Sequence, residues 1–435
     1  MRENKCTSRE ERNLMKKSTT KLAILLSLGL GFSMTAGIAK AASPVSIRVI
    51  AQTGGPGTAL KDAAAVYNKS HPNVTVSVDL FDYDPTRQRT VLSYASGKNT
   101  YDVLGFDYAW EKQYVDSGYL IPLGDMAAKQ APLINMKDFI PSYVSWATIS
   151  GKQYALPWFG AVYMLYYRTD LLKQAGVAVP KTWEEYASAA ATLKKKLSMP
   201  GTTLIGKRDD PLLDEFWSVA WSYGASITTP DLKTSLVNSP KALQAFTVWK
   251  KVLASAPQDA LAADWPAAAA TFSAGKSAMM LNFSDTSDSL IAPGSKVAGK
   301  VGFAAIPSGP TGKSTPNLGG WGLGVSAKSK NVQAAFDFIA WATSAEQQKA
   351  GLINGGSANR ISVLSDKTLQ AKYPYYAAAL VNYKNAIYFP NTSHWVDWEA
   401  AMAPPLSSAL SGQISASAAI KQSSDRLIAE IKKEK

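Results

Sequence analysis

The chain after residue 44 alternates between strand patterns and helix patterns, and this order restricts the fold more than any other feature. Apolar residues alternate along Val45–Ala51, and a glycine-rich turn then leads to an expected helix over Ala59–Ser70. The same pair of patterns repeats in Val74–Leu80 and Thr86–Ala95, and the apolar Tyr101–Phe106 supplies a third strand. Strands separated by helices predict a parallel sheet covered by helices on both faces, which is an α/β fold.

Later segments repeat this mixture of elements. Ser239 and Pro240 have the residue types of a helix cap and a first helical position, and a final helix is expected over Ser417–Lys433. The glycine-rich and proline-rich stretches Pro307–Pro316 and Gly319–Gly324 resemble connections between domains. Because 435 residues exceed one ordinary core, we expect two domains without a flexible tether.

The N-terminal segment has the pattern of an export signal. Lysines at 16, 17 and 21 precede the apolar run Leu22–Ile38, and small residues follow it. This pattern predicts a signal peptide over residues 1–42, cleaved near Ala41 or Ala42, with Met1 or Met15 as the start. The alternative is a retained membrane anchor, but the run is short and rich in glycine for a stable span.

Cysteine usage supports export. The only cysteine, Cys6, precedes the apolar run, so it cannot carry a lipid at a cleavage site. The chain after the predicted cleavage therefore has no disulfide, no thiolate metal site and no cysteine nucleophile. We expect the periplasm of a bacterium with two membranes, and the alternative is true secretion.

The positive charge does not predict a nucleic-acid partner. The formal net charge is +13, but the first 41 residues carry eight Lys or Arg against three Glu, which leaves +8 for the rest. The remaining basic residues are scattered among acids, and no long basic stripe with interleaved aromatics is present.

Motifs for common catalytic chemistry are absent from the sequence. The two histidines, His71 and His394, have no metal-ligand spacing, and no phosphate-binding glycine motif follows the first strand. Ser273 and Lys276 match S-x-x-K without the other motifs of serine acylation. We therefore expect neither a cofactor nor a metal.

Paired carboxylates keep one enzymatic alternative open, an exported glycoside hydrolase. The three pairs are Asp82 and Asp84, Asp209 and Asp210, and Asp285 and Asp288.

Several segments, taken in order, resemble one protein family. They include IRVIAQTGGPG, YDVLGFDYAWEKQYVDSGYLIPL, GKQYALPWFGAVYMLYYRTDLL, NSPKALQAF, FSAGKSAMMLNFSD, KVGFAAIPSGP, LGGWGLGVSAKSKNVQAAFDFIAWATS and FPNTSHWVDWEAAM. Across nearly the whole chain after the signal, the sequence is similar to carbohydrate-binding proteins of ABC importers, the group of maltose-binding protein and the sorbitol and mannitol binders. One departure is Ala358-Asn359-Arg360, where the family often has Pro-x-Arg.

The resemblance implies two α/β lobes, each built on a mainly parallel sheet, with hinge crossings between them. It places lobe 1 at residues 43–159 and 322–385, and lobe 2 at residues 160–321 and 386–435. The crossings would lie near Pro157–Tyr163, Gly319–Gly324 and Ala386–Asn391, and the ligand would sit in the cleft between the lobes. Trp158 and Phe159 would face this cleft, whereas Tyr166 and Tyr167 would belong to a structural strand of lobe 2.

A sugar or polyol has apolar C–H faces and a rim of hydroxyls, so aromatic rings and polar side chains suit it. The family landmarks and the ends of the expected strands place sixteen candidate ligand-binding residues in cleft-facing loops. They are Gln52, Thr53, Asp82, Asp84, Asp107, Tyr108, Trp158, Phe159, Asp214, Trp217, Asn282, Asp285, Trp321, Arg360, Trp395 and Trp398. Trp217 and Trp398 fit a hydrophobic core equally well.

These features together predict a non-enzymatic, monomeric periplasmic receptor that delivers a sugar or sugar alcohol to a membrane permease. Besides the hydrolase, an alternative is a receptor of the same fold for a polyamine or another cation, because the expected cleft is rich in aspartate.

Overall fold

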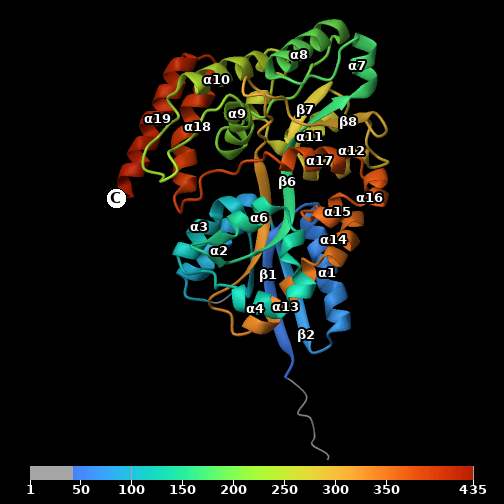
Figure 1. Ribbon diagram of the computed structural model, residues 1–435, viewed down its shortest axis with the longest axis vertical. Helices are drawn as coiled ribbons and strands as arrows, with labels where there is room; N and C mark the ends of the chain where they lie inside the picture. Colours follow the sequence, from blue (N-terminus) through green and yellow to red (C-terminus); the bar gives the residue numbers. More distant parts are fainter. Residues whose placement is uncertain (1–42, 99, 435) are drawn as a thin grey trace, which may run out of the picture. The chain divides into compact units, whose positions relative to one another are not determined.

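A single large sheet connects the elements of the structure, a computed structural model that describes residues 43–98 and 100–434 (Figure 1). The predicted signal peptide at residues 1–42 lies outside this part of the chain. Six strands follow one another in the order β2-β1-β3-β9-β6-β7, and β8 pairs beside them with β6.

The first strands and helices are those expected from the sequence. They are β1 (Val45–Gln52), α1 (Gly55–Ser70), β2 (Val74–Phe81), α2 (Tyr83–Ala95) and β3 (Val103–Asp107). Strand β1 pairs in parallel with β2 and with β3, which confirms the predicted parallel arrangement. The alternating residues that face the core are buried because helices pack on this sheet, as α1 does on β2.

The other strands pair differently. They are β6 (Leu156–Arg168), β7 (Met279–Phe283), β8 (Val301–Ala304) and β9 (Leu318–Val325). Strand β9 is antiparallel to β3 and to β6, and β6 is antiparallel to β7 and β8. The expectation of a mainly parallel sheet in each lobe therefore holds for β1 to β3 and not for the pairs made by β6 and β9. A separate small sheet pairs β4 (Thr148–Ile149) with β5 (Lys152–Gln153).

Helices cover both ends of the long strand β6, which joins the group of elements around β1 to the group around β7 (Figure 1). The helices after β3 are α3 (Tyr108–Asp116), α4 (Gly124–Lys129), α5 (Ala131–Ile134) and α6 (Pro141–Trp146). Those after β6 are α7 (Thr169–Ala175), α8 (Trp183–Leu197), α9 (Asp210–Ser222), α10 (Pro240–Leu253), α11 (Trp265–Ser273) and α12 (Ser287–Ile291).

The helices after β9 complete the structure. They are α13 (Val332–Ala342), α14 (Ala345–Gly351), α15 (Ile361–Leu364), α16 (Lys367–Lys372), α17 (Tyr375–Tyr383), α18 (Trp395–Leu410) and α19 (Ala416–Lys433). Single 3-10 turns lie at Met136–Asp138, Ala260–Ala262, Ser284–Thr286 and Leu352–Asn354. Ser239 caps α10 by accepting from the backbone N–H of Ala242 at 3.2 Å, which confirms the helix start predicted there.

The aromatic run in β6 is a buried strand. Every residue of Leu156–Arg168 is buried except the half-buried Tyr167. Tyr166 is structural, because its hydroxyl donates to the backbone carbonyl of Phe283 at 2.7 Å. Trp158 and Phe159 are only 6% and 5% exposed.

Glycines in β9 allow large side chains to approach the strand. A Cβ atom at Gly322 would lie 2.8 Å from the Cβ of Ala155 and 2.9 Å from Cη2 of Trp146. Such separations are well inside van der Waals contact, so this position requires glycine while Trp146 packs here. The close contact fixes the strand that carries Trp321.

We predict that Gly322→Ala lowers the free energy of unfolding by about 1–3 kcal/mol, because the added methyl overpacks a full core. The matched control is Gly124→Ala, since nothing lies within 4 Å of its Cβ position. Urea unfolding of both variants measures the difference. Equal stability of the two variants would contradict the prediction, because it would show that Trp146 and Ala155 move aside for the added methyl group without cost.

Candidate ligand-binding site

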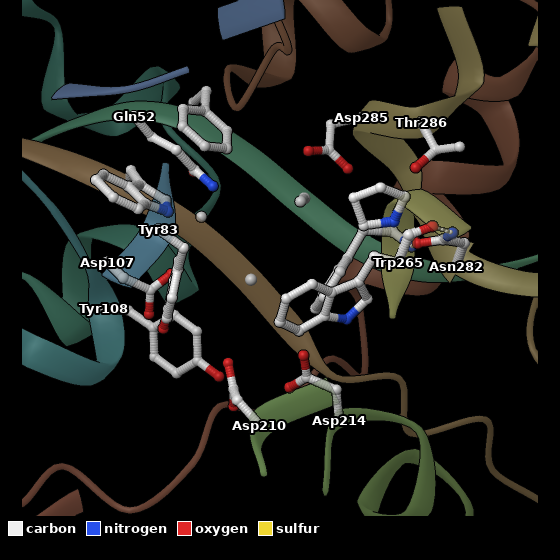
Figure 2. Close-up of a pocket in the computed structure, with 17 residues that line it drawn as sticks. Gln52, Tyr83, Asp107, Tyr108, Asp210, Asp214, Trp265, Asn282, Asp285 and Thr286 are labelled. Carbon is white, nitrogen blue, oxygen red and sulfur yellow. Dashed lines mark hydrogen bonds between the residues drawn. The ribbon is translucent and has the colours of Figure 1, made fainter. Parts of the chain in front are cut away.

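A cavity of about 210 Å³ lies beside the paired strands β6 and β9, where they run from the group of elements around β1 to the group around β7 (Figure 2). Its lining comes from eight separate segments of the chain. The lining residues are Gln52, Tyr83, Asp107, Tyr108, Phe159, Ala161, Asp210, Asp214, Trp265, Pro266, Asn282, Phe283, Asp285, Thr286, Gly319, Gly320 and Trp321.

The first side of the cavity is formed at the carboxyl ends of the parallel strands. Gln52 is the last residue of β1, Asp107 is the last residue of β3, and Tyr83 begins the helix after β2. Loops that leave the carboxyl ends of neighbouring parallel strands meet at one edge of a sheet, which is where open α/β sheets bind ligands. The parallel pairing of β1 with both neighbours therefore explains why these side chains converge.

Asp107 is held rigidly at the start of α3. It is 6% exposed, and its Oδ1 accepts from the backbone N–H of Ala109 at 2.8 Å, so it caps the helix. In the sheet it stands directly opposite Trp321 of β9. The pairing of these two strands places a carboxylate beside an indole.

The second side of the cavity includes the first turns of α9. Asp210 and Asp214 are four residues apart, so their carboxylates lie on one face of the helix and both point at the cavity (Figure 2). Asp214 is 2% exposed and accepts a hydrogen bond from the side-chain amide of Asn317. Just before the helix, Asp209 adopts φ 93° and ψ −146°, a conformation that costs a non-glycine residue about 1–3 kcal/mol.

Asn282 joins the lining residues of α11 to those of β7 by hydrogen bonds. Its Nδ2 donates to the backbone carbonyl of Trp265 at 3.0 Å, and its Oδ1 accepts from the N–H of Phe283 at 2.8 Å. Both polar atoms are thus used within the protein, and the residue fixes the start of α11 against the end of β7. Asp285 and Thr286 follow in a 3-10 turn and face the same space (Figure 2).

Aromatic rings form the apolar part of the lining. Trp321 stacks on Phe159 with ring centroids 6.3 Å apart and an interplanar angle of 14°. Tyr83 lies 6.0 Å from the Trp321 ring and 6.3 Å from the Trp265 ring, and so links the two indoles. Trp321 is only 2% exposed, whereas Trp265 is half-buried and presents more surface to the cavity.

Burial raises the pKa of every carboxyl group in the lining. The pKa of Asp210 rises to about 7, because burial is reinforced by the nearby charges of Asp84 and Asp209. Burial raises the pKa of Asp285 to about 6. The pKa values of Asp107 and Asp214 lie well above their usual range for the same reason, and the charge of Asp210 adds to both shifts. The raised pKa values bring the protonation of Asp210 and Asp285 close to neutral pH.

Eight of the sixteen residues predicted from the sequence line this cavity. They are Gln52, Asp107, Tyr108, Phe159, Asp214, Asn282, Asp285 and Trp321.

Four predicted residues lie close to the cavity but outside its lining. Thr53 and Asp82 are exposed, and the Thr53 hydroxyl donates to Asp82 Oδ1 at 2.7 Å. Asp84 is exposed in the first turn of α2, and its charge acts on Asp210. Trp158 lines a separate small cavity of about 30 Å³, and its ring stands edge-on to Phe159.

The other four predicted residues serve the packing of the fold. Arg360 is fully buried over the ring of Phe139, and its guanidinium donates to the backbone carbonyls of Thr343 at 2.9 Å and Ile134 at 2.7 Å. The remaining three are buried tryptophans in helices. Trp217 packs beside Phe216, Trp395 stacks on Phe389, and Trp398 donates its indole N–H to Glu434.

Sequence reasoning missed Tyr83, Asp210 and Trp265. Asp210 fits a solvated turn in the sequence, but the structure places it at the start of a helix, four residues before Asp214. The proline that follows it is the available signal, since proline favours the first turn of a helix. An Asp-Trp-Pro sequence marks Trp265 in the same way, as Asp264 caps α11. Tyr83 lies between Asp82 and Asp84, two residues that the sequence predicts to bind the ligand.

Two negative findings apply to residues 43–98 and 100–434. No group of three or more His, Cys, Asp and Glu side chains there is arranged to hold a metal ion. None of the helices in that part of the chain combines the length and the apolar character needed to cross a membrane.

Known proteins resemble the chain in sequence and in structure. A probable ABC transporter-binding protein of Deinococcus radiodurans is 35% identical over 282 residues, which is 61% of this chain. The match spans 65% of that relative's own length, just under two thirds. Among solved structures, a solute-binding protein of Agrobacterium radiobacter K84 in complex with ribitol is 26% identical with a TM-score of 0.81. The two structures match over 89% of this chain and 99% of that one.

A second solved structure, maltose-bound MalE3 of T. maritima, gives a TM-score of 0.81 at 25% identity over 90% of this chain and 100% of that one. The chain therefore has the two-lobe fold of the periplasmic binding proteins, which confirms the predicted fold class. The pattern of the family described as bacterial extracellular solute-binding protein matches residues 51–349. That match covers more than half of the sequence, and the chain is thus an exported protein that belongs to the family of bacterial extracellular solute-binding proteins.

Proposed function

We propose that this protein is a receptor that captures a sugar or sugar alcohol in the cavity and delivers it to the permease of an ABC importer. The observation that carries the proposal is the lining itself, which combines aromatic rings with four carboxylates and includes the carboxyl ends of the parallel strands β1 and β3. The relatives that bind ribitol and maltose support the same ligand class. We place the protein in the periplasm and expect it to act as a monomer.

The chemistry of the lining suits a hydroxyl-rich ligand. Trp265, Tyr83 and Phe159 offer flat apolar surfaces for C–H groups, and the carboxylates accept hydrogen bonds from hydroxyls. A hydrogen bond to a charged partner contributes about 1.5–3 kcal/mol, so several such bonds would select strongly for correctly placed hydroxyls. Asp107 and Asp214 are already fixed by Ala109 and Asn317, which reduces the entropy lost on binding.

The size of the cavity favours a small ligand. Pockets for drug-sized molecules measure roughly 300–1,000 Å³, and this cavity holds about 210 Å³. We therefore propose a single sugar unit or a linear polyol rather than an oligosaccharide.

We further propose that the two lobes close over the ligand by bending at β6 and β9, close to the predicted boundaries at residues 159 and 321, and at a third crossing just before α17 instead of the expected segment 386–391. Helix α17 packs against β6 and β8, so we assign it to the second lobe and move the third boundary from residue 385 to a position before Tyr375. Hinges of this kind absorb a large change of backbone angle over a few residues.

The two alternatives receive no comparable support. The family consists of solute-binding proteins, which are not enzymes, so the hydrolase alternative is set aside. The relatives described above bind a sugar and a polyol, which favours a hydroxyl-rich ligand over a polyamine or another cation without hydroxyls.

The function is tested by thermal unfolding of the purified protein in the presence of sugars and polyols. We expect at least one pentitol, hexitol or monosaccharide to raise the melting temperature in a concentration-dependent way, with no conversion of the ligand detected by chromatography. Failure of every sugar and polyol to do so would contradict the proposal.

We predict that Trp265→Ala weakens binding of that ligand by roughly tenfold or more, a loss of about 1.4 kcal/mol, because an apolar face of the ligand is left without a partner. The control is Trp341→Ala, since Trp341 is also half-buried but packs on Tyr67 away from the cavity. Calorimetric titration measures both affinities. A similar loss in the control would point to destabilisation of the fold instead of a lost contact.

Affinity for a neutral ligand should also rise with pH. Ligand hydroxyls donate to ionised carboxylates, so binding favours the charged forms and releases the protons held by Asp210 and Asp285. Because these pKa values are about 7 and about 6, we expect affinity to rise by roughly threefold to tenfold between about pH 5 and about pH 8 and then to level off. Titrations across this range test the expectation, and an affinity that falls with pH would refute it.

A further inference from the structure

We propose that the ligand carries one protonated amine in addition to its hydroxyls, as an amino sugar or an amino polyol does. This inference rests on the proposed function, because it concerns the ligand of the same cavity.

The charge of the lining is entirely of one sign. Four of the seventeen lining residues are aspartates, and no lysine, arginine or histidine is among them. The carboxylates come from three separate segments: the end of β3, the start of α9 and the turn after β7. They are Asp107, Asp210, Asp214 and Asp285.

The surroundings of these carboxylates add more negative charge. Asp84 and Asp209 act on Asp210, Glu399 acts on Asp214, and Asp288 acts on Asp285. Arg208 is the cation beside this cluster, but its side chain is 63% exposed and its Nε lies 4.0 Å from Asp209, outside the lining. Neutral hydroxyls can bond to such a cluster, yet they bring no charge to balance it. An ammonium group does both.

Three of the four carboxylates identify the end of the cavity that the amine would occupy. Asp210 and Asp214 share one face of α9, and the charge of Asp107 raises the pKa of Asp214. These three carboxylates lie below the centre of Figure 2, whereas Asp285 lies above it, beside Thr286. The amine is therefore assigned to the Asp107, Asp210 and Asp214 end, and the hydroxyls to the end that contains Asp285.

Aromatic rings beside the amine end support the assignment. Tyr83 and Tyr108 lie next to Asp107 and Asp210 in the lining (Figure 2). The face of an aromatic ring attracts a cation, and this attraction strengthens where water is excluded. The same rings cover C–H groups of the ligand, so the site suits a compact cation with an apolar face.

The test compares ligands that differ only in the amine. Glucosamine is paired with glucose, galactosamine with galactose, and glucamine with sorbitol, and each is titrated by calorimetry at neutral pH. We expect the amine to bind at least about tenfold tighter than its neutral counterpart in at least one pair, and added salt to reduce this preference. Equal or tighter binding of the neutral member in every pair would overturn the inference that the ligand carries an amine, and it would leave the proposed function intact. Binding of no member would count against both.

Substitutions then locate the charge. Asp210→Asn should remove the preference for the amine while the neutral sugar still binds, whereas Asp285→Asn should weaken both members of a pair by a similar factor. The control is Asp425→Asn, because Asp425 lies outside the lining, is 53% exposed and pairs with Lys421. It should change neither affinity. An unchanged amine preference in Asp210→Asn would overturn the inference.

Discussion

Strand β9 pairs with β3 on one side and with β6 on the other, and the rest of the structure depends on this double pairing. Through β3 it joins the parallel strands β1 and β2, and through β6 it joins β7 and β8. Its glycines let Trp146 and Tyr143 pack directly on the backbone. This close packing positions the strand where it carries Trp321, and the lining of the cavity is built around that indole.

The same pairing explains why a small cavity gathers residues from the whole chain. Strands β6 and β9 pass from one group of elements to the other, so side chains from both groups meet beside them. Asp107 comes from the end of a parallel strand, and Asp214 comes from a helix that starts more than a hundred residues later. Each is held by a bond within the protein, to Ala109 and to Asn317. The orientation of these two side chains is thus fixed by the protein itself.

Carboxylates concentrated in this way raise one another's pKa values, because burial removes water and each charge repels the next. Hydrogen bonds to Ala109 and Asn317 hold Asp107 and Asp214 in place, whereas Asp209, just before Asp210, adopts unfavourable backbone angles. A ligand that donates hydrogen bonds or positive charge would relieve the repulsion. Binding of such a ligand would therefore be coupled to the release of protons.

The sequence by itself determined the order of strands and helices, the capped start of α10, and eight of the residues that line the cavity, because periodicity and caps are local properties. It did not separate Trp321, which lines the cavity, from Trp395 and Trp398, which are buried in the core. Nor did it show that the guanidinium of Arg360 donates its hydrogen bonds to backbone carbonyls, or that Asp210 lines the cavity. Only the tertiary structure decided these points, because the neighbours of a side chain come from segments far away in the sequence, and the antiparallel pairs of β9 set which segments meet.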